Sequence, residues 1–159
     1  MKGLFIISAL GILAMLAEIF KFKKLLYPIV LVGILGAYAA NFMEWGQNNM
    51  SIPMFNNMIH FNDMSLAFSG VILVTAFFCF ILANDYFEED HVTDHFALVL
   101  FALVGALMLT SFRNMTTLFL GVEILSIPMY VLAVSRKRDL ASNEARFKYL
   151  IMCSFGSGF

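Results

Sequence analysis

The sequence predicts an all-α protein, a polytopic bundle of transmembrane helices. Of its 159 residues, 61% are hydrophobic and 13% are charged, whereas soluble domains average about 45–50% apolar and about 25% charged residues. The apolar residues occur in blocks, and about 20 apolar residues in a helix cross the hydrocarbon core of a bilayer. Helices are favoured over a β-barrel because the blocks show no strand-like alternation.

Five apolar blocks are long enough to form full membrane-spanning helices. The first follows Met1-Lys2 but exceeds the usual signal-peptide core of about 7–15 residues and lacks a cleavage site, so we expect a retained helix. A sixth block is still apolar at Phe159, after too few residues to cross, so we expect a truncated helix of a longer protein. Gly33, Gly36 and Ala40 have a spacing that allows close helix packing. The predicted helices, within one membrane domain, are residues 3–20, 25–43, 64–83, 96–112, 115–134 and 144–159.

Basic residues in the connecting loops predict the orientation. The first loop (21–24) and the fifth loop (136–138) each carry three Lys or Arg residues, and the second loop (44–63) carries none. The positive-inside rule therefore places the odd-numbered loops in the cytoplasm and the N-terminus outside. The third loop (84–95) is acidic and departs from this pattern, although acidic residues count little in the rule.

Glu123 is the most informative residue, because it lies near the middle of the apolar block 115–134. A carboxylate at the bilayer centre costs at least about 2.5 kcal/mol on insertion scales, and such residues usually face a bundle interior or a water pathway. Helical spacing aligns Glu123 with three other polar side chains. These residues, Thr116, Glu123, Ser126 and Tyr130, are called the polar stripe below.

Two interpretations of Glu123 remain open. Burial away from water favours the protonated acid, and a nearby cation favours the carboxylate. A Glu beside a cation that approaches and leaves can therefore load and release a proton. Alternatively, Glu123 forms a static ion pair between two helices, but ionisable residues inside membranes are functional by default, which favours proton handling.

Lys148 is the second candidate, one turn into the sixth predicted helix. Glu144 precedes it by four residues, in the favourable order for an ion pair on a helix. An ammonium in a medium of low dielectric constant can lose its proton and act as a relay. Lys148 could equally extend to the headgroups at the membrane surface, and the sequence does not decide between these roles.

Other candidate sites are weaker. Cys79 and Cys153 are isolated, so we expect any redox cofactor to lie on another chain. His91 and His95 have a metal-ligand spacing, but a solvated acidic loop is the favoured interpretation. For Arg113, in the short fourth loop, ion pairing and lipid anchoring stay open. The net charge of −1 gives no reason to expect nucleic acid as a partner.

Three segments resemble subunit N of the proton-translocating NADH–quinone oxidoreductase, respiratory complex I. The stretch LFLGVEILSIPMYVLA (118–133) resembles the fifth helix of that family, and EARFKYLIMCSFGSG (144–158) resembles the sixth. DMSLAF (63–68) resembles the start of its third helix. The form Leu-Phe-Leu-Gly-x-Glu favours subunit N over two antiporter-like sister subunits, whose fifth helix usually has Trp before the Glu.

The resemblance implies site residues. Glu123 matches a Glu that pairs with a seventh-helix Lys in the family, and that Lys would lie beyond Phe159. Lys148 matches a sixth-helix Lys on the same polar axis, with Glu144 in support. These are the expected proton-transfer residues, and the chain itself is expected to bind no cofactor or metal.

The resemblance also implies a function. Such a non-redox translocase subunit couples electron transfer from NADH to quinone to proton transport across the inner (plasma) membrane. NADH, flavin, iron–sulfur clusters and quinone would lie on or between partner subunits, and lipid would surround the helices. The alternatives are a subunit of a multisubunit cation/proton antiporter, which would use the same Glu and Lys, and a purely structural membrane anchor.

Overall fold

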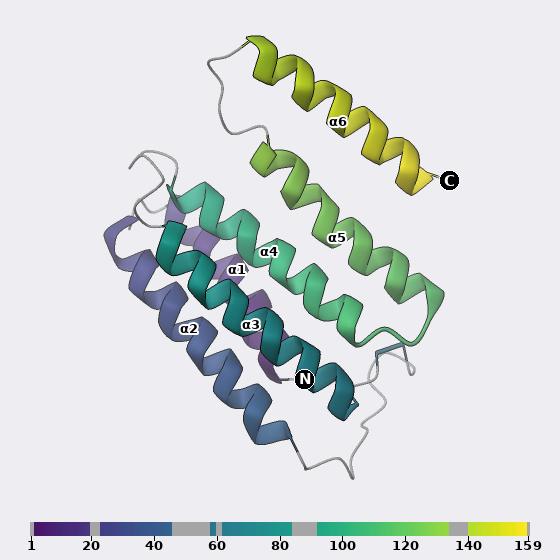
Figure 1. Ribbon diagram of the computed structural model, residues 1–159. Helices are drawn as coiled ribbons and strands as arrows, with labels where there is room; N and C mark the ends of the chain where they lie inside the picture. The colour runs from purple at the N-terminus through teal and green to yellow at the C-terminus, as the bar shows by residue number, and fades with distance from the viewer. Residues whose placement is uncertain are drawn as a thin grey trace.

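The computed structural model describes residues 2–19, 23–45, 58–59, 62–83, 92–133 and 140–158, and these residues are almost entirely helical (Figure 1). Outside the helices, one isolated antiparallel bridge joins Ile59 to Phe112. The helices are α1 (Lys2–Ile19), α2 (Lys23–Glu44), α3 (Asp63–Ala83), α4 (Val92–Thr110), α5 (Met115–Ala133) and α6 (Leu140–Gly158). The predicted all-α fold class is therefore confirmed.

Two helices begin one turn earlier than the apolar blocks predict. Helix α4 starts at Val92 rather than at residue 96, and α6 starts at Leu140 rather than at residue 144. Polar residues occupy both added turns, namely Thr93-Asp94 and Ser142-Asn143. Hydropathy does not detect such turns, although Asp, Ser, Thr and Asn are the residues that favour helix starts.

The chain has the character of an integral membrane protein. Within the described residues, three helices are long and apolar enough to cross a bilayer, over Leu26–Glu44, Asp63–Leu82 and Met115–Leu132. The apolar parts of α1 and α4, Lys2–Ala17 and His95–Thr110, are shorter. Large apolar side chains on the outer surface, such as Met115 and Leu82, are more than three-quarters exposed, which suits lipid rather than water.

Helix α4 lies at the centre of the bundle. It contacts α1, α2, α3 and α5, and its Leu100 is fully buried. The ring of Phe96, also on α4, packs against Phe80 of α3 at 5.3 Å and against Tyr27 of α2 at 6.0 Å between ring centroids. Helices α1 to α4 therefore share one apolar core.

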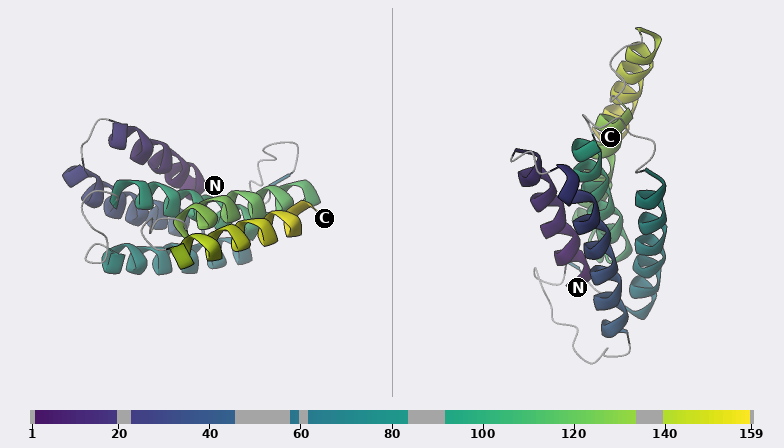
Figure 2. Two further views of the ribbon diagram at one scale, coloured as in Figure 1. Left: turned by 90° about the horizontal axis from the view of Figure 1, so that it is seen from above. Right: turned by 90° about the vertical axis from the view of Figure 1, so that its left-hand side faces the viewer.

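Helices α5 and α6 extend outward from this core (Figures 1 and 2). Helix α5 packs on α4, and α6 contacts α5 alone among the described helices. The segment 58–59 lies against the turn between α4 and α5, where the carbonyl oxygen of Met58 accepts hydrogen bonds from the backbone N–H of Arg113 (3.2 Å) and from the Thr117 hydroxyl (3.1 Å). This contact anchors the beginning of α5.

Candidate functional site

The packing of α5 on α4 sets the direction of the polar stripe. A Cβ atom added to Gly105 of α4 would lie 2.5 Å from the backbone nitrogen of Leu125, so the two backbones nearly touch. At Gly121 of α5 the approach is less close, since an added Cβ atom would lie 3.0 Å from the side chain of Leu109 on α4. A bulkier residue at Gly105 would force the two helices apart, so this contact fixes the rotation of α5 about its axis.

The polar stripe lies on the far side of α5 from α4. Thr117, Gly121 and Pro128 are the buried positions of α5, and at about 100° per residue they share one face. Glu123 lies about 120–160° around the helix from that face. The stripe is therefore directed away from the bundle core and toward α6.

Helix α6 covers part of the stripe. The rings of Tyr130 and Tyr149 meet edge to face with their centroids 5.7 Å apart. Tyr130 also interacts with Ser126 on its own helix and with Cys153 on α6, and Glu123 is an electrostatic neighbour. Glu123, Ser126 and Tyr130 are half-buried, whereas Thr116 is exposed. Tyr130 thus lies at the α5–α6 contact, and Ser126 and Glu123 precede it on the same face of α5.

Glu123 itself has no counter-charge within the described part of the chain. It is the ninth of the nineteen residues of α5, close to the middle of the span. Neither an ion pair nor a hydrogen bond to its carboxyl group is formed by the described side chains, and the Ser126 hydroxyl donates instead to the carbonyl oxygen of Val122 at 2.6 Å. A half-buried carboxyl group is therefore left available for a partner.

Lys148 and Glu144 pair with each other on α6. The ammonium nitrogen of Lys148 lies 2.6 Å from a carboxylate oxygen of Glu144, and the two side chains are 70% and 69% exposed. Lys148 directly precedes Tyr149, so it is about 100° away from the face of α6 that meets α5. In the described residues it forms no ion pair with Glu123.

Sequence reasoning missed Tyr149 and Cys153 as parts of the site. Their spacing of four residues places them on one face of α6, but neutral residues in an apolar block give no signal by themselves. His95 lies in the first turns of α4 and is buried, whereas its predicted companion His91 is outside the described residues. No three His, Cys, Asp or Glu side chains gather into a metal-binding group in the part that the structure describes.

Comparisons with known proteins identify relatives along nearly the whole chain. Residues 113–159 match the family described as NADH:quinone oxidoreductase/Mrp antiporter, transmembrane region. NADH-quinone oxidoreductase subunit N of Cytophaga hutchinsonii is 44% identical, and the match covers 99% of this chain and 34% of the relative. Subunit N of Flavobacterium johnsoniae is 40% identical with the same coverage. The chain thus spans about a third of the length of these relatives.

A solved structure has the same fold. A chain of respiratory complex I from Thermus thermophilus with bound aureothin superimposes with a TM-score of 0.79 and 23% sequence identity. The match covers 98% of this chain and 34% of that chain. The solved structure thus confirms the fold. The sequence relatives confirm the resemblance to subunit N that residues 63–68, 118–133 and 144–158 predict.

Proposed function

We propose that this chain, a relative of subunit N of NADH–quinone oxidoreductase, forms part of a proton-translocating membrane subunit in which Glu123 handles a proton. The oxidation of NADH and the reduction of quinone belong to partner subunits, which hold the flavin and iron–sulfur clusters. This chain supplies no redox group. Its role is to couple electron transfer to proton movement across the membrane.

The environment of Glu123 carries this proposal. Its carboxyl group is half-buried at mid-span, lies beside two hydroxyl-bearing side chains, and has no counter-charge among the described residues. A carboxylate in this position costs several kcal/mol on most scales. If α5 were purely structural, an apolar residue at position 123 would make it more stable. The presence of Glu123 therefore favours a function that requires a titrating group.

The mechanism that we propose is electrostatic. When a cation lies near Glu123, the carboxylate is favoured, and when the cation is withdrawn, the protonated acid is favoured. A charge change that begins at the redox subunits and moves such a cation would therefore load or release a proton at this carboxyl group. Lys148, with Glu144 in support, lies on the outer face of α6 and is a second proton-transfer group.

Substitutions in the complete assembled complex test the role of Glu123. Glu123→Ala and Glu123→Gln should lower NADH-driven proton pumping by about tenfold or more, because they remove the proton-binding group. Glu44→Gln is the matched control, since it removes a carboxylate from the end of α2 but keeps an acceptor for the backbone nitrogen of Lys2. Unchanged pumping in both Glu123 variants would refute the proposal.

A subunit of a multisubunit cation/proton antiporter is the second candidate. The matching family description includes the Mrp antiporters, and the same Glu and Lys would serve there. Copurification discriminates: flavin and iron–sulfur subunits support the oxidoreductase, and antiporter subunits support the alternative. A structural anchor predicts that Glu123→Gln reduces assembly but leaves the turnover of assembled complexes intact.

The proposed location is the inner (plasma) membrane, with the N-terminus outside. This orientation follows from the basic residues of the first and fifth loops. A protease-sensitive tag at the N-terminus of the complete protein, in intact spheroplasts, should be cleaved by external protease. Cleavage of the tag only after lysis would show that the N-terminus lies on the cytoplasmic side, which contradicts the proposed orientation.

A further inference from the structure

Tyr130 is the stripe residue at which α5 meets α6. Its ring lies edge to face against that of Tyr149, with the centroids 5.7 Å apart. Its hydroxyl interacts with Ser126 on the same helix and with Cys153 on α6. A phenylalanine would make the same ring contact, and a hydroxyl in an apolar span costs free energy unless it has polar partners. The contact with Tyr149 therefore accounts for the ring of Tyr130 but not for its hydroxyl.

The hydroxyl of Tyr130 lies on the side of its own backbone that faces Glu123. At about 100° and about 1.5 Å per residue, Tyr130 lies about 20° around the helix from Glu123 and about 10 Å further along the axis. Long side chains on helices lean back toward the N-terminal end, and the interaction with Ser126, one turn earlier, has this direction. Glu123 is also an electrostatic neighbour of Tyr130. The phenol group therefore belongs to the environment of the carboxyl group.

Ser126 occupies the position between Glu123 and Tyr130. Its hydroxyl donates to the carbonyl oxygen of Val122 at 2.6 Å. A serine oxygen also has two lone pairs, so it can accept a hydrogen bond from the Tyr130 hydroxyl. A carboxyl group, a hydroxyl and a phenol thus follow one another at one-turn spacing, all at half-buried positions of α5.

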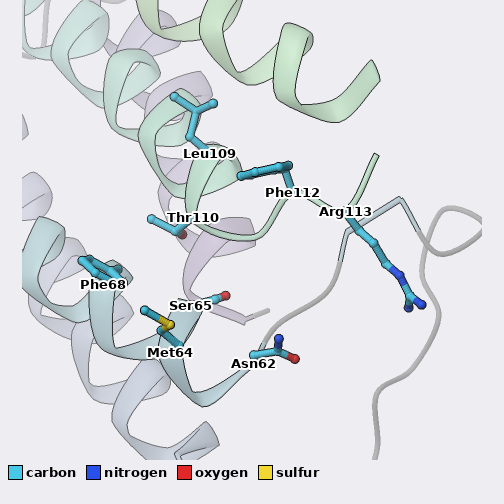
Figure 3. A pocket seen from close by; sticks show the side chains of 8 residues that line it. All are labelled: Asn62, Met64, Ser65, Phe68, Leu109, Thr110, Phe112 and Arg113. Carbon is cyan, nitrogen blue, oxygen red and sulfur yellow. The ribbon is translucent and has the colours of Figure 1, made fainter. Parts of the chain in front are cut away.

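Within the described residues, the other end of α5 offers no comparable series of polar groups. Phe119 and Leu120 occupy the positions between Thr116 and Glu123 on this face, and neither can pass a proton. A cavity of about 680 Å³ lies near this end, beside the turn between α4 and α5 (Figure 3). None of its lining residues belongs to α5, so it does not lead to Glu123.

We propose, on the basis of the function proposed above for Glu123, that the Tyr130 hydroxyl is a proton-relay group between Glu123 and the Ala133 end of α5. When the carboxylate takes up a proton, the Ser126 hydroxyl supplies it, directly or through a water molecule, and receives the proton of the Tyr130 hydroxyl. The Tyr130 oxygen then takes a proton from solvent at the membrane surface. Both hydroxyls end as they began, and one proton has moved. Release of a proton reverses each step.

Tyr130→Phe in the complete assembled complex tests the relay, because it removes the hydroxyl and keeps a ring against Tyr149. The rate of NADH-driven proton pumping should fall about threefold, which is less than in Glu123→Gln, because water can replace the hydroxyl in part. Tyr27→Phe is the matched control, since Tyr27 of α2 is also half-buried and also packs its ring against another ring, that of Phe96. The control should pump at the native rate.

Tyr130→Leu separates the relay from a structural role, because it removes the ring together with the hydroxyl. The Leu variant should unfold at a lower temperature than the Phe variant, since the aromatic contact with Tyr149 is lost. If the hydroxyl carries the proton, both variants should pump equally slowly in the molecules that assemble. Slow pumping by Tyr130→Leu beside normal pumping by Tyr130→Phe would overturn the relay, because the ring alone would then matter.

Time-resolved infrared spectroscopy distinguishes a failure of the relay from a failure of the function proposed for Glu123. After mixing with NADH, the carboxyl band that is missing in Glu123→Gln should reach full amplitude in Tyr130→Phe but should develop about threefold more slowly. Development of this band at the native rate would overturn the relay and leave the role of Glu123 intact. Absence of the band from the native complex would contradict both.

Discussion

The α2–α3 contact and the α5–α6 contact both include polar side chains. They differ in whether these side chains have hydrogen-bond or ion-pair partners. At the first contact, the Asn41 amide donates to the Leu66 carbonyl oxygen at 3.1 Å and to the Ser69 hydroxyl at 2.9 Å. The Ser69 hydroxyl donates in turn to the same carbonyl. On the face of α5 that carries the second contact, Glu123 has no ion-pair partner within the described residues.

We propose that this difference separates a structural role from a functional one. Asn41 and Ser69 are almost completely buried and bonded to each other, as is expected of interhelical hydrogen bonds that hold a membrane bundle together. Glu123 is half-buried and ionisable, and α6 covers its stripe only in part. We propose that this carboxyl group, which has no counter-charge within the described residues, exchanges a proton.

The variant with the largest expected effect on stability tests whether the close contact with α4 holds α5 in place. Gly105→Val should destabilise the complete protein by about 3 kcal/mol, because the side chain would collide with the backbone at Ile124 and Leu125. Thermal unfolding of the purified protein measures the loss. Gly36→Val is the matched control, since nothing lies within 4 Å of a Cβ atom at Gly36. Equal stability of the two variants would contradict the close α4–α5 contact.

The second prediction concerns the hydrogen-bonded cluster. Asn41→Ala should lower the free energy of unfolding by about 1–2 kcal/mol, because both interhelical hydrogen bonds disappear. Its proton pumping per NADH oxidised should stay normal in the molecules that assemble. Thr75→Ala is the control, because Thr75 is exposed and bonds only within its own helix, at 2.8 Å to the Val71 carbonyl oxygen. A pumping defect in stable Asn41→Ala complexes would remove the contrast with Glu123.

The smallest expected effect on stability is at Lys148. The Lys148–Glu144 pair is more than two-thirds exposed on both sides, and such pairs contribute about 0.5 kcal/mol or less. Lys148→Gln should therefore leave the unfolding temperature nearly unchanged. If Lys148 transfers protons, the same variant should still lower proton pumping in assembled complexes. Normal proton pumping in this variant would show that Lys148 does not transfer protons.

The positions of the helices could be predicted from the sequence because a membrane-spanning segment is a long apolar block. The close contact between α4 and α5 could not be predicted in this way. The spacing of Gly33, Gly36 and Ala40 suggested close packing on α2, and Gly33 does lie against Leu10 of α1, whereas Gly36 faces open space. Residue spacing shows which side chains share a face of a helix. It does not show which neighbouring helix covers that face.

The candidate site, too, could be predicted from the sequence only in part. Glu123 stands out in the sequence because a carboxyl group in the middle of an apolar block is costly. Its surroundings do not stand out, since Tyr149 and Cys153 are neutral residues that matter only once α6 folds against α5.

Infrared difference spectroscopy on the assembled complex tests the central claim most directly. Adding NADH should change a carboxyl band in the native protein, because Glu123 gains or loses a proton during turnover. The same band should be missing from the difference spectrum of Glu123→Gln and present in that of Glu44→Gln. Identical difference spectra for all three proteins would contradict a change of protonation at Glu123.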